Sequence, residues 1–193
     1  MAREFSLAYL TLPGVDPMEQ IRIAGRAGYD YVSLRTIPMG LPGEPQVHPE
    51  QDPQLLEALK DQLQRCGVRL LDIELVRIRE DQPEDYRAAF AAGAAMGAKH
   101  ILSSVWTRDY AFAAERYRAI CDQAAEFDMT VNMEFPVVSE MRTLQETVEM
   151  KRRVGRDNLK IFVDTLYAHW DKVTPQQLQQ IPKEDFGIIL HLV

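Results

Sequence analysis

The chain has 193 residues, of which 46% are hydrophobic and 26% are charged, a composition typical of one sizeable globular domain. Its formal net charge of −7 does not indicate the clusters of Lys and Arg that bind nucleic acid or an anionic membrane surface. We therefore expect small-molecule or protein partners. The first ten residues lack the pattern of a secretion signal, and no apolar run approaches the roughly 18 residues of a membrane span. These observations predict a cytoplasmic protein.

A joint between a helix and a strand recurs along the chain. In each joint a helical pattern ends at a glycine and an apolar strand follows within a few residues, as at Gly28, Gly67, Gly97 and Gly155, while Asp128 stands where a fifth glycine would be. Glycine tolerates the left-handed conformation that closes a helix. The joints are about 27 to 39 residues apart, which predicts repeated βα units and a parallel sheet.

The strands and helices are predicted in strict alternation. Seven strands are expected at residues 5–11, 30–35, 69–76, 99–104, 129–135, 159–165 and 187–193, and helices at 17–27, 53–66, 83–96, 110–127, 143–154 and 174–180. Asp16, Thr143 and Thr174 are expected to cap helices, because each precedes an acid or amide by three residues. Cys66 and Cys121 fall inside helical patterns and are expected to be reduced packing residues.

Two architectures are compatible with this order: an open doubly wound sheet, or a (β/α)₈ barrel of which seven strands are present. The segment after the first strand, TLPGVDP, is no G-x-G-x-x-G turn, so a dinucleotide-binding sheet has little support. The barrel is favoured because polar residues gather at the ends of the strands, where the βα loops of a barrel meet. We therefore predict a TIM-barrel-type domain over residues 1–193, incomplete at its C-terminus.

The polar residues at strand ends suggest a metal site. They are Arg35, Glu74, Arg77, Ser103, Ser104, Glu134, Asp164 and His191. Buried carboxylates are costly unless they are paired or bind a cation. Glu134, Asp164 and His191 offer two carboxylates and an imidazole, which suits Mn²⁺, Mg²⁺ or Co²⁺, with Zn²⁺ also possible. The alternative is that the two carboxylates pair with nearby arginines and that His191 is a core histidine.

The order of motifs resembles the xylose-isomerase-like TIM barrels, which include sugar phosphate isomerase/epimerases and endonuclease IV-like proteins. The resemblance is carried by AGRAGYDYVSLR, GVRLLDIELVRI, MGAKHILSS, VNMEF, FVDTLY and ILHLV. In this family, residues on strands five to eight bind one divalent metal ion, and the first three correspond to Glu134, Asp164 and His191. A fourth, a glutamate on strand eight, has no counterpart here, which implies either a fragment or a homo-oligomer formed through exposed barrel edges.

The resemblance implies proton abstraction next to a carbonyl through an enediolate, with Glu134 as metal ligand and base together. Where the family often has a histidine, this chain has Tyr167, so Tyr167 is a candidate substrate contact. Trp106 is a candidate wall of the pocket.

Three charged residues each have two possible roles. Arg35 and Arg77 are candidates for binding a substrate carboxylate or phosphate, or are solvated rim arginines. Glu74 is either a second carboxylate at the end of the barrel where the βα loops meet, or the ion-pair partner of one of these arginines. The long loop after the second strand, residues 36–51, is expected to be a lid or substrate loop.

Three functions follow from these expectations. The first is a metal-dependent isomerase or epimerase of a sugar, sugar phosphate or related keto compound, and the second is a lyase on the same scaffold that acts like a 3-dehydroshikimate dehydratase. The third is a truncated homologue without catalytic activity. A DNA-repair role is disfavoured, because that branch of the family uses several zinc ions and many histidines, whereas this chain has four.

Overall fold

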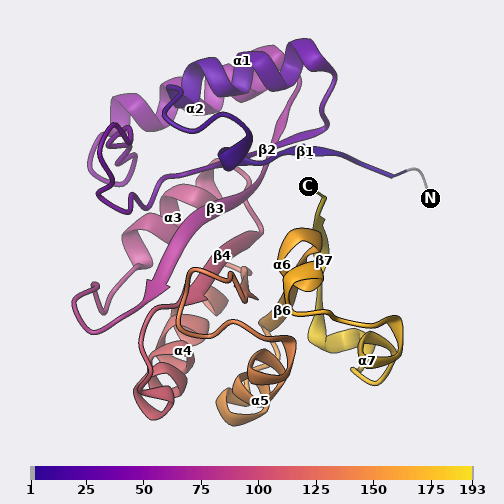
Figure 1. The fold of residues 1–193 in the computed structure, drawn as a ribbon. Coiled ribbons are helices and arrows are strands. Elements are labelled where there is room, and N and C mark those ends of the chain that lie inside the picture. Colours follow the sequence, from indigo (N-terminus) through magenta and orange to yellow (C-terminus); the bar gives the residue numbers. More distant parts are fainter. Residues whose placement is uncertain (1–2, 193) are drawn as a thin grey trace. The chain divides into compact units, whose positions relative to one another are not determined.

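A computed structural model of the chain describes residues 3–192 and contains seven strands within that range (Figure 1). The strands are β1 (Ser6–Leu7), β2 (Tyr31–Leu34), β3 (Arg69–Ile78), β4 (His100–Val105), β5 (Thr130–Glu134), β6 (Leu159–Asp164) and β7 (Phe186–His191). Their order in the sheet is the order of the chain. The pairs β1–β2, β2–β3, β5–β6 and β6–β7 are parallel, as the repeated βα units predict.

The helices lie between the strands. They are α1 (Pro17–Ala27), α2 (Pro53–Cys66), α3 (Arg87–Ala95), α4 (Tyr110–Ala125), α5 (Leu144–Val154), α6 (Thr165–Trp170) and α7 (Pro175–Gln179), with short 3₁₀ turns η1 (Tyr9–Thr11) and η2 (Lys183–Asp185). The predicted joints are confirmed: all four joint glycines have positive φ, between 63° and 98°, and Asp128 has a φ of 55°. The predicted caps are confirmed as well, with capping boxes at Thr143 and Thr174 and an Asp16 side chain that accepts from Met18 N.

The structure differs from the prediction in four main places, besides shifts of one or two residues at other ends. The expected first strand is only two residues long, because Thr11 N and Leu12 N donate to Ala8 O and Tyr9 O and close a 3₁₀ turn. The third strand runs on to Ile78, and a helix that was not expected begins at Thr165. Val193, the last residue of the expected seventh strand, lies outside the described residues.

The fourth difference is the start of α3, which was expected at residue 83 and lies at Arg87. The side chain of Gln123 from α4 forms hydrogen bonds with the segment that precedes α3. Its Oε1 accepts from Tyr86 N and its Nε2 donates to Glu84 O, both at 2.8 Å. These two backbone groups are therefore bonded to a side chain instead of to a helical turn.

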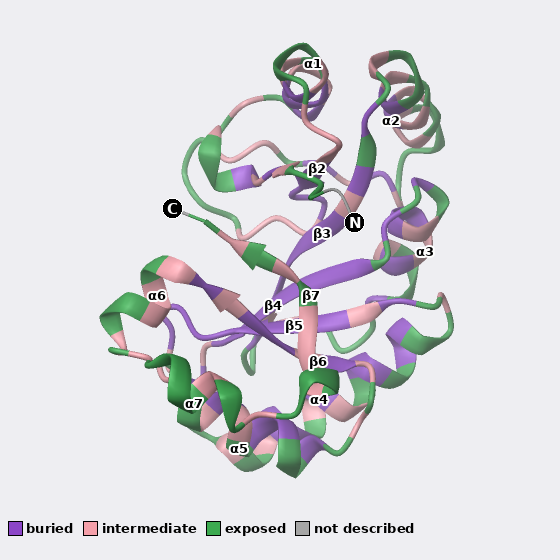
Figure 2. Ribbon diagram, turned by 90° about the vertical axis from the view of Figure 1, so that its right-hand side faces the viewer, coloured by how far each residue is buried: buried purple, intermediate pink, exposed green. Residues whose placement is uncertain are grey.

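The chain divides into two compact units, each with its own core. Unit 1 runs to Leu75 and includes Arg87–Ile101, and unit 2 consists of Val76–Tyr86 and the chain from Leu102 onward. Fully buried side chains of unit 1 include Ile21, Leu34, Leu59, Ile73 and Phe90, and those of unit 2 include Tyr117, Ile120, Met129, Phe135 and Phe162. In Figure 2, β4 is coloured as buried, in agreement with the burial of all six of its residues.

Strand β7 is exposed on one face. Ile188, Leu190 and Leu192 are 83%, 54% and 71% exposed, while the alternating residues Gly187, Ile189 and His191 are partly buried. This alternation is that of a strand with one covered face and one open face. The open face carries three aliphatic side chains.

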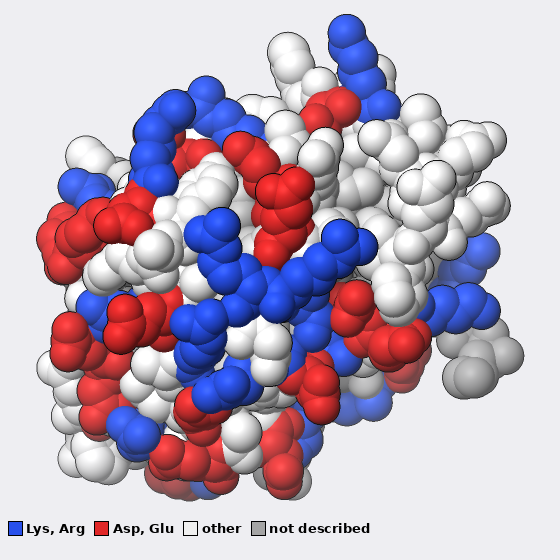
Figure 3. Space-filling model, turned by 90° about the horizontal axis from the view of Figure 1, so that it is seen from below, with Lys and Arg blue, Asp and Glu red and all other residues white. Residues whose placement is uncertain are grey.

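The surface carries charges of both signs. In the view of Figure 3, Lys and Arg side chains lie beside Asp and Glu side chains. Unit 2 contains several such pairs at its surface, including Arg108 with Glu140 at 2.6 Å and Arg156 with Asp122 at 2.7 Å. Among residues 3–192, no helix combines the length and the hydropathy needed to cross a membrane. Cys66 and Cys121 are free thiols, and Cys121 is fully buried.

Candidate metal centre

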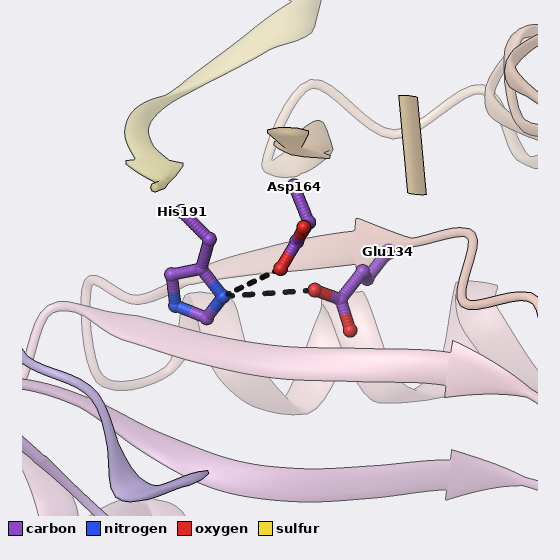
Figure 4. Close-up of side chains that lie close together, drawn as sticks. All are labelled: Glu134, Asp164 and His191. Atoms are coloured by element: carbon purple, nitrogen blue, oxygen red, sulfur yellow. Dashed lines mark ion pairs between the residues drawn. The ribbon is translucent and has the colours of Figure 1, made fainter. Parts of the chain in front are cut away.

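Three neighbouring strands of unit 2 end in the three predicted metal ligands. Glu134 is the last residue of β5, Asp164 of β6 and His191 of β7. His191 Nδ1 lies 3.5 Å from Asp164 Oδ2 and 3.7 Å from Glu134 Oε1, and the three side chains point toward one another (Figure 4). One ligand atom from each lies within 4.8 Å of the other two. The parallel strands thus bring together residues that are 27 to 57 positions apart in the sequence.

The two oxygens of Asp164 have different partners. Oδ1 accepts from Leu166 N at 2.7 Å and from Tyr167 N at 3.4 Å, so the carboxylate is the N-cap of α6. Oδ2 faces His191. Because the cap holds one oxygen, the orientation of the other toward the site is set by the start of the helix.

The His191 ring is positioned by strand pairing and by an aromatic contact. His191 pairs with Asp164 across β6 and β7. Its ring meets Phe162 edge-on, with ring centroids 4.5 Å apart and an interplanar angle of 85°. The His191 side chain is 22% exposed, against 10% for Glu134 and 8% for Asp164.

These three residues fit a divalent metal ion. An ion about 2.1 Å from each ligand atom holds two such atoms roughly 3.0 to 4.2 Å apart, depending on the angle between them. Both distances from His191 Nδ1 fall in that range. Two nearly buried carboxylates repel each other, and a divalent cation offsets both charges. The donor set of two carboxylates and one imidazole suits Mn²⁺, Co²⁺ or Zn²⁺.

Tyr167 belongs to the same neighbourhood. Burial raises the pKa of its phenol to about 12, and the negative charges of Glu134 and Asp164 raise it in the same direction. Its ring packs against the apolar cluster of Phe135, Leu144 and Ile161. At neutral pH Tyr167 is therefore a neutral hydroxyl group beside two carboxylates, which can donate or accept a hydrogen bond.

Arg35 and Glu74 lie in unit 1 and form an ion pair. Arg35 NH2 donates to Glu74 Oε2 at 2.8 Å, and NH1 lies 3.3 Å from Glu44 Oε1. All three side chains are at most 5% exposed, and the guanidinium also lies 4.2 Å from the centre of the Tyr9 ring. Burial alone would lower the pKa of Arg35, but its two carboxylate partners raise it. This geometry favours a structural ion pair between Arg35 and Glu74 over the binding of a substrate anion by Arg35.

Arg77 is the residue before the end of β3 and Trp106 directly follows β4, both in unit 2. Arg77 NH2 donates to Gln82 Oε1 at 3.4 Å, and Trp106 Nε1 donates to Ser104 Oγ at 2.8 Å. In the described part of the chain, the group of acidic, histidine and cysteine side chains close enough to share a metal ion is Glu134, Asp164 and His191. The capping role of Asp164 was not predicted from the sequence, although Asp is a common N-cap residue.

Comparisons with known proteins agree with this architecture. No curated protein matches the chain. Among solved structures, the IolI protein with a bound zinc atom is 16% identical with a TM-score of 0.77, covering 95% of this chain and 70% of its own. D-allulose 3-epimerase from Methylomonas sp., in complex with D-allulose, is 18% identical with a TM-score of 0.73, covering 95% of this chain and 70% of its own.

A third structure is much longer than this chain. A xylose isomerase-like TIM barrel/4-hydroxyphenylpyruvate dioxygenase fusion protein is 16% identical with a TM-score of 0.69, and the match covers 94% of this chain but only 30% of the fusion protein. At such identities the likeness concerns the fold. The family model described as xylose isomerase-like TIM barrel matches residues 21–192, most of the chain. The chain therefore belongs to the xylose isomerase-like TIM barrel family, with seven parallel strands of the barrel present.

Proposed function

We propose that this protein is a divalent-metal-dependent isomerase or epimerase of a sugar, sugar phosphate or related keto compound. The observation that carries the proposal is the convergence of Glu134, Asp164 and His191 at the ends of three adjacent strands. The names of two structural relatives, an epimerase with bound D-allulose and a zinc-containing protein, support the same reaction class and the use of a metal.

The three residues would hold the ion, and Glu134 has a further role as the base. A bound divalent ion supplies a Lewis acid for a substrate carbonyl oxygen. Glu134 takes the proton from the carbon next to that carbonyl and returns it. Its side chain is only 10% exposed and lies at the end of β5, within the candidate site.

Tyr167 is the substrate contact that we favour. Its phenol is protonated at neutral pH, as any phenol is, and burial raises its pKa further, to about 12. A neutral hydroxyl group beside two carboxylates can donate a hydrogen bond to a sugar hydroxyl or carbonyl oxygen. Arg77 and Trp106 remain candidate substrate contacts, whereas Arg35 and Glu74 already neutralise each other.

The test is an assay of metal-stripped protein after addition of Mn²⁺, Co²⁺, Mg²⁺ or Zn²⁺. Ketose and ketose phosphate isomerisation and epimerisation are expected to appear only with metal. Glu134→Gln should lower the rate by about 100-fold or more, since it removes the base and a ligand charge. Glu149→Gln makes the same change on the exposed face of α5 and serves as the control.

Other results would contradict the proposal. Metal-dependent dehydration of 3-dehydroshikimate without any ketose reaction would replace the isomerase by a lyase. Absence of metal binding by wild-type protein, or an active Glu134→Gln variant, would remove the enzyme hypothesis altogether.

A further inference from the structure

A glycine of β7 lies against an asparagine of β5, within unit 2. A methyl group on Gly187 would overlap Asn132 Oδ1 and would lie 3.6 Å from both Asn132 Cγ and Lys160 Cβ. Gly187 is not among the glycines with positive φ, so alanine would suit its backbone. What excludes a side chain at residue 187 is therefore the position of the Asn132 carboxamide.

The Asn132 side chain has little freedom to move aside. The residue is 1% exposed, and its Nδ2 donates to Thr130 Oγ1 at 3.2 Å. Its backbone oxygen accepts from Ser103 Oγ at 3.0 Å. The side-chain oxygen is buried and accepts no hydrogen bond from the described residues. A buried acceptor without a partner is costly, so hydrogen bonding alone does not account for its position against Gly187.

This contact lies just before the metal centre along both strands. Asn132 is two residues before Glu134 on β5, and Gly187 is four residues before His191 on β7, each on the same face as the ligand that follows it. The β7 pairing shifts here, because Phe186 pairs with Ile161 while Leu190 pairs with Val163. Gly187 thus lies in the irregular stretch of β7 that leads to His191.

We propose that Gly187 is a positioning residue for the metal centre, because a side chain at this residue would meet the Asn132 carboxamide and displace β7. Because Gly187 has no side chain, β7 can pair with β6 while the Asn132 side chain reaches past β6 to Gly187, and His191 then lies 3.7 Å from Glu134. Neither Gly187 nor Asn132 touches the ion. The inference rests on the proposed function, since it assumes that Glu134, Asp164 and His191 bind a metal ion.

The experiment compares Co²⁺ binding by the full chain and four variants. Gly187→Ala should weaken Co²⁺ binding by about tenfold or more and alter the visible spectrum of the bound ion, the loss expected when a ligand is misplaced. Asn132→Ser, which removes the carboxamide, should bind nearly as wild type. The double variant Gly187→Ala with Asn132→Ser should recover affinity to within roughly threefold of Asn132→Ser.

The matched control is Gly25→Ala in unit 1. A methyl group on Gly25 would lie 2.9 Å from both Cβ and the backbone oxygen of Cys66, so it causes similar crowding at residues outside the metal centre. Thermal unfolding is measured for every variant. Gly25→Ala should lose stability and keep its Co²⁺ affinity, which separates a loss of ligand position from a loss of stability.

Each outcome bears on the inference. Folded Gly187→Ala that binds Co²⁺ as tightly as wild type, or a double variant that stays as weak as Gly187→Ala, would refute it. If Gly187→Ala does not fold, Asn132→Gln introduces similar crowding from β5 and must weaken Co²⁺ binding in folded protein. If wild type itself does not bind Co²⁺, Mn²⁺ or Zn²⁺, the proposed function fails first, and that result is distinct from unchanged binding by Gly187→Ala.

Discussion

Arg35 and Glu74 form an ion pair at 2.8 Å in unit 1, with side chains that are 5% and 4% exposed. Glu44 Oε1 lies 3.3 Å from the same guanidinium, while its other oxygen accepts from Gly40 N at 2.7 Å and Leu41 N at 3.1 Å. The loop that follows β2 is therefore tied to β3 through one buried arginine. Such a charge is tolerated inside a protein because its partners are in place.

Removal of one partner of this pair should be strongly destabilising. We expect Glu74→Gln or Arg35→Met to lower the free energy of unfolding by about 3 kcal/mol or more, because a buried charge loses its partner. Arg35→Met combined with Glu74→Gln should cost less than the sum of the two. Denaturant titration measures these values, and additive losses would argue against the pairing. The exposed pair of Lys60 and Glu57 is the control, and its removal should change little.

Asp164 variants should separate helix capping from metal binding. Asp164→Asn keeps an oxygen that can accept from Leu166 N, so α6 should remain capped while metal affinity falls by about tenfold or more. Asp164→Ala also removes the cap and should be less stable than Asp164→Asn by about 1 kcal/mol. Denaturation and Mn²⁺ titration of both variants test this. Equal stability of the two would show that the cap contributes nothing.

The stability of unit 2 should decrease in acid because of Glu146. Burial alone would raise the pKa of this carboxyl, but hydrogen bonds from Arg142 N, Thr143 and Tyr110 OH lower it below its usual value. A folded-state pKa below the unfolded one gives stability that is present at neutral pH and is lost as the pH falls through the folded value. Glu146→Gln should therefore show a smaller loss of stability between about pH 6 and pH 3. Parallel curves for wild type and variant would exclude this contribution.

The exposed face of β7 should promote self-association. Ile188 and Leu190 on β7, with Leu192 directly after the strand, form an exposed aliphatic row, a feature that favours contact with another chain. We expect the purified protein to elute in size-exclusion chromatography as an oligomer that dissociates on dilution. Ile188→Thr with Leu190→Thr keeps residues that favour strands while removing the apolar row, and should shift the protein toward monomer. An unchanged elution volume would place the contact elsewhere.

The elements that were predictable from sequence depend on local chemistry. Glycines that close helices have positive φ wherever they were expected, and Asp128 adopts the same conformation. The convergence of Glu134, Asp164 and His191 was also predictable, because parallel strands place their carboxyl ends at one edge, whatever the intervening helices contain. Thr143 and Thr174 cap helices through groups only three residues away.

The features that were not predictable depend on contacts between distant segments. The partners of Arg35 come from three different segments, including a loop without regular structure. The contact of Gly187 with Asn132 occurs where the pairing of β7 shifts, and no local pattern encodes that shift. The late start of α3 similarly depends on Gln123, 36 positions after Arg87 in the sequence.

The cap on α6 also provides a spectroscopic reporter of the candidate metal centre. The Leu166 amide donates to one oxygen of Asp164, while the other oxygen faces His191. The two oxygens of the Asp164 carboxylate share one negative charge. Any change in that charge alters the strength of the hydrogen bond from the Leu166 amide. The nitrogen-15 chemical shift of Leu166, and its rate of deuterium exchange, will therefore follow occupancy of the centre directly, before any substrate is known.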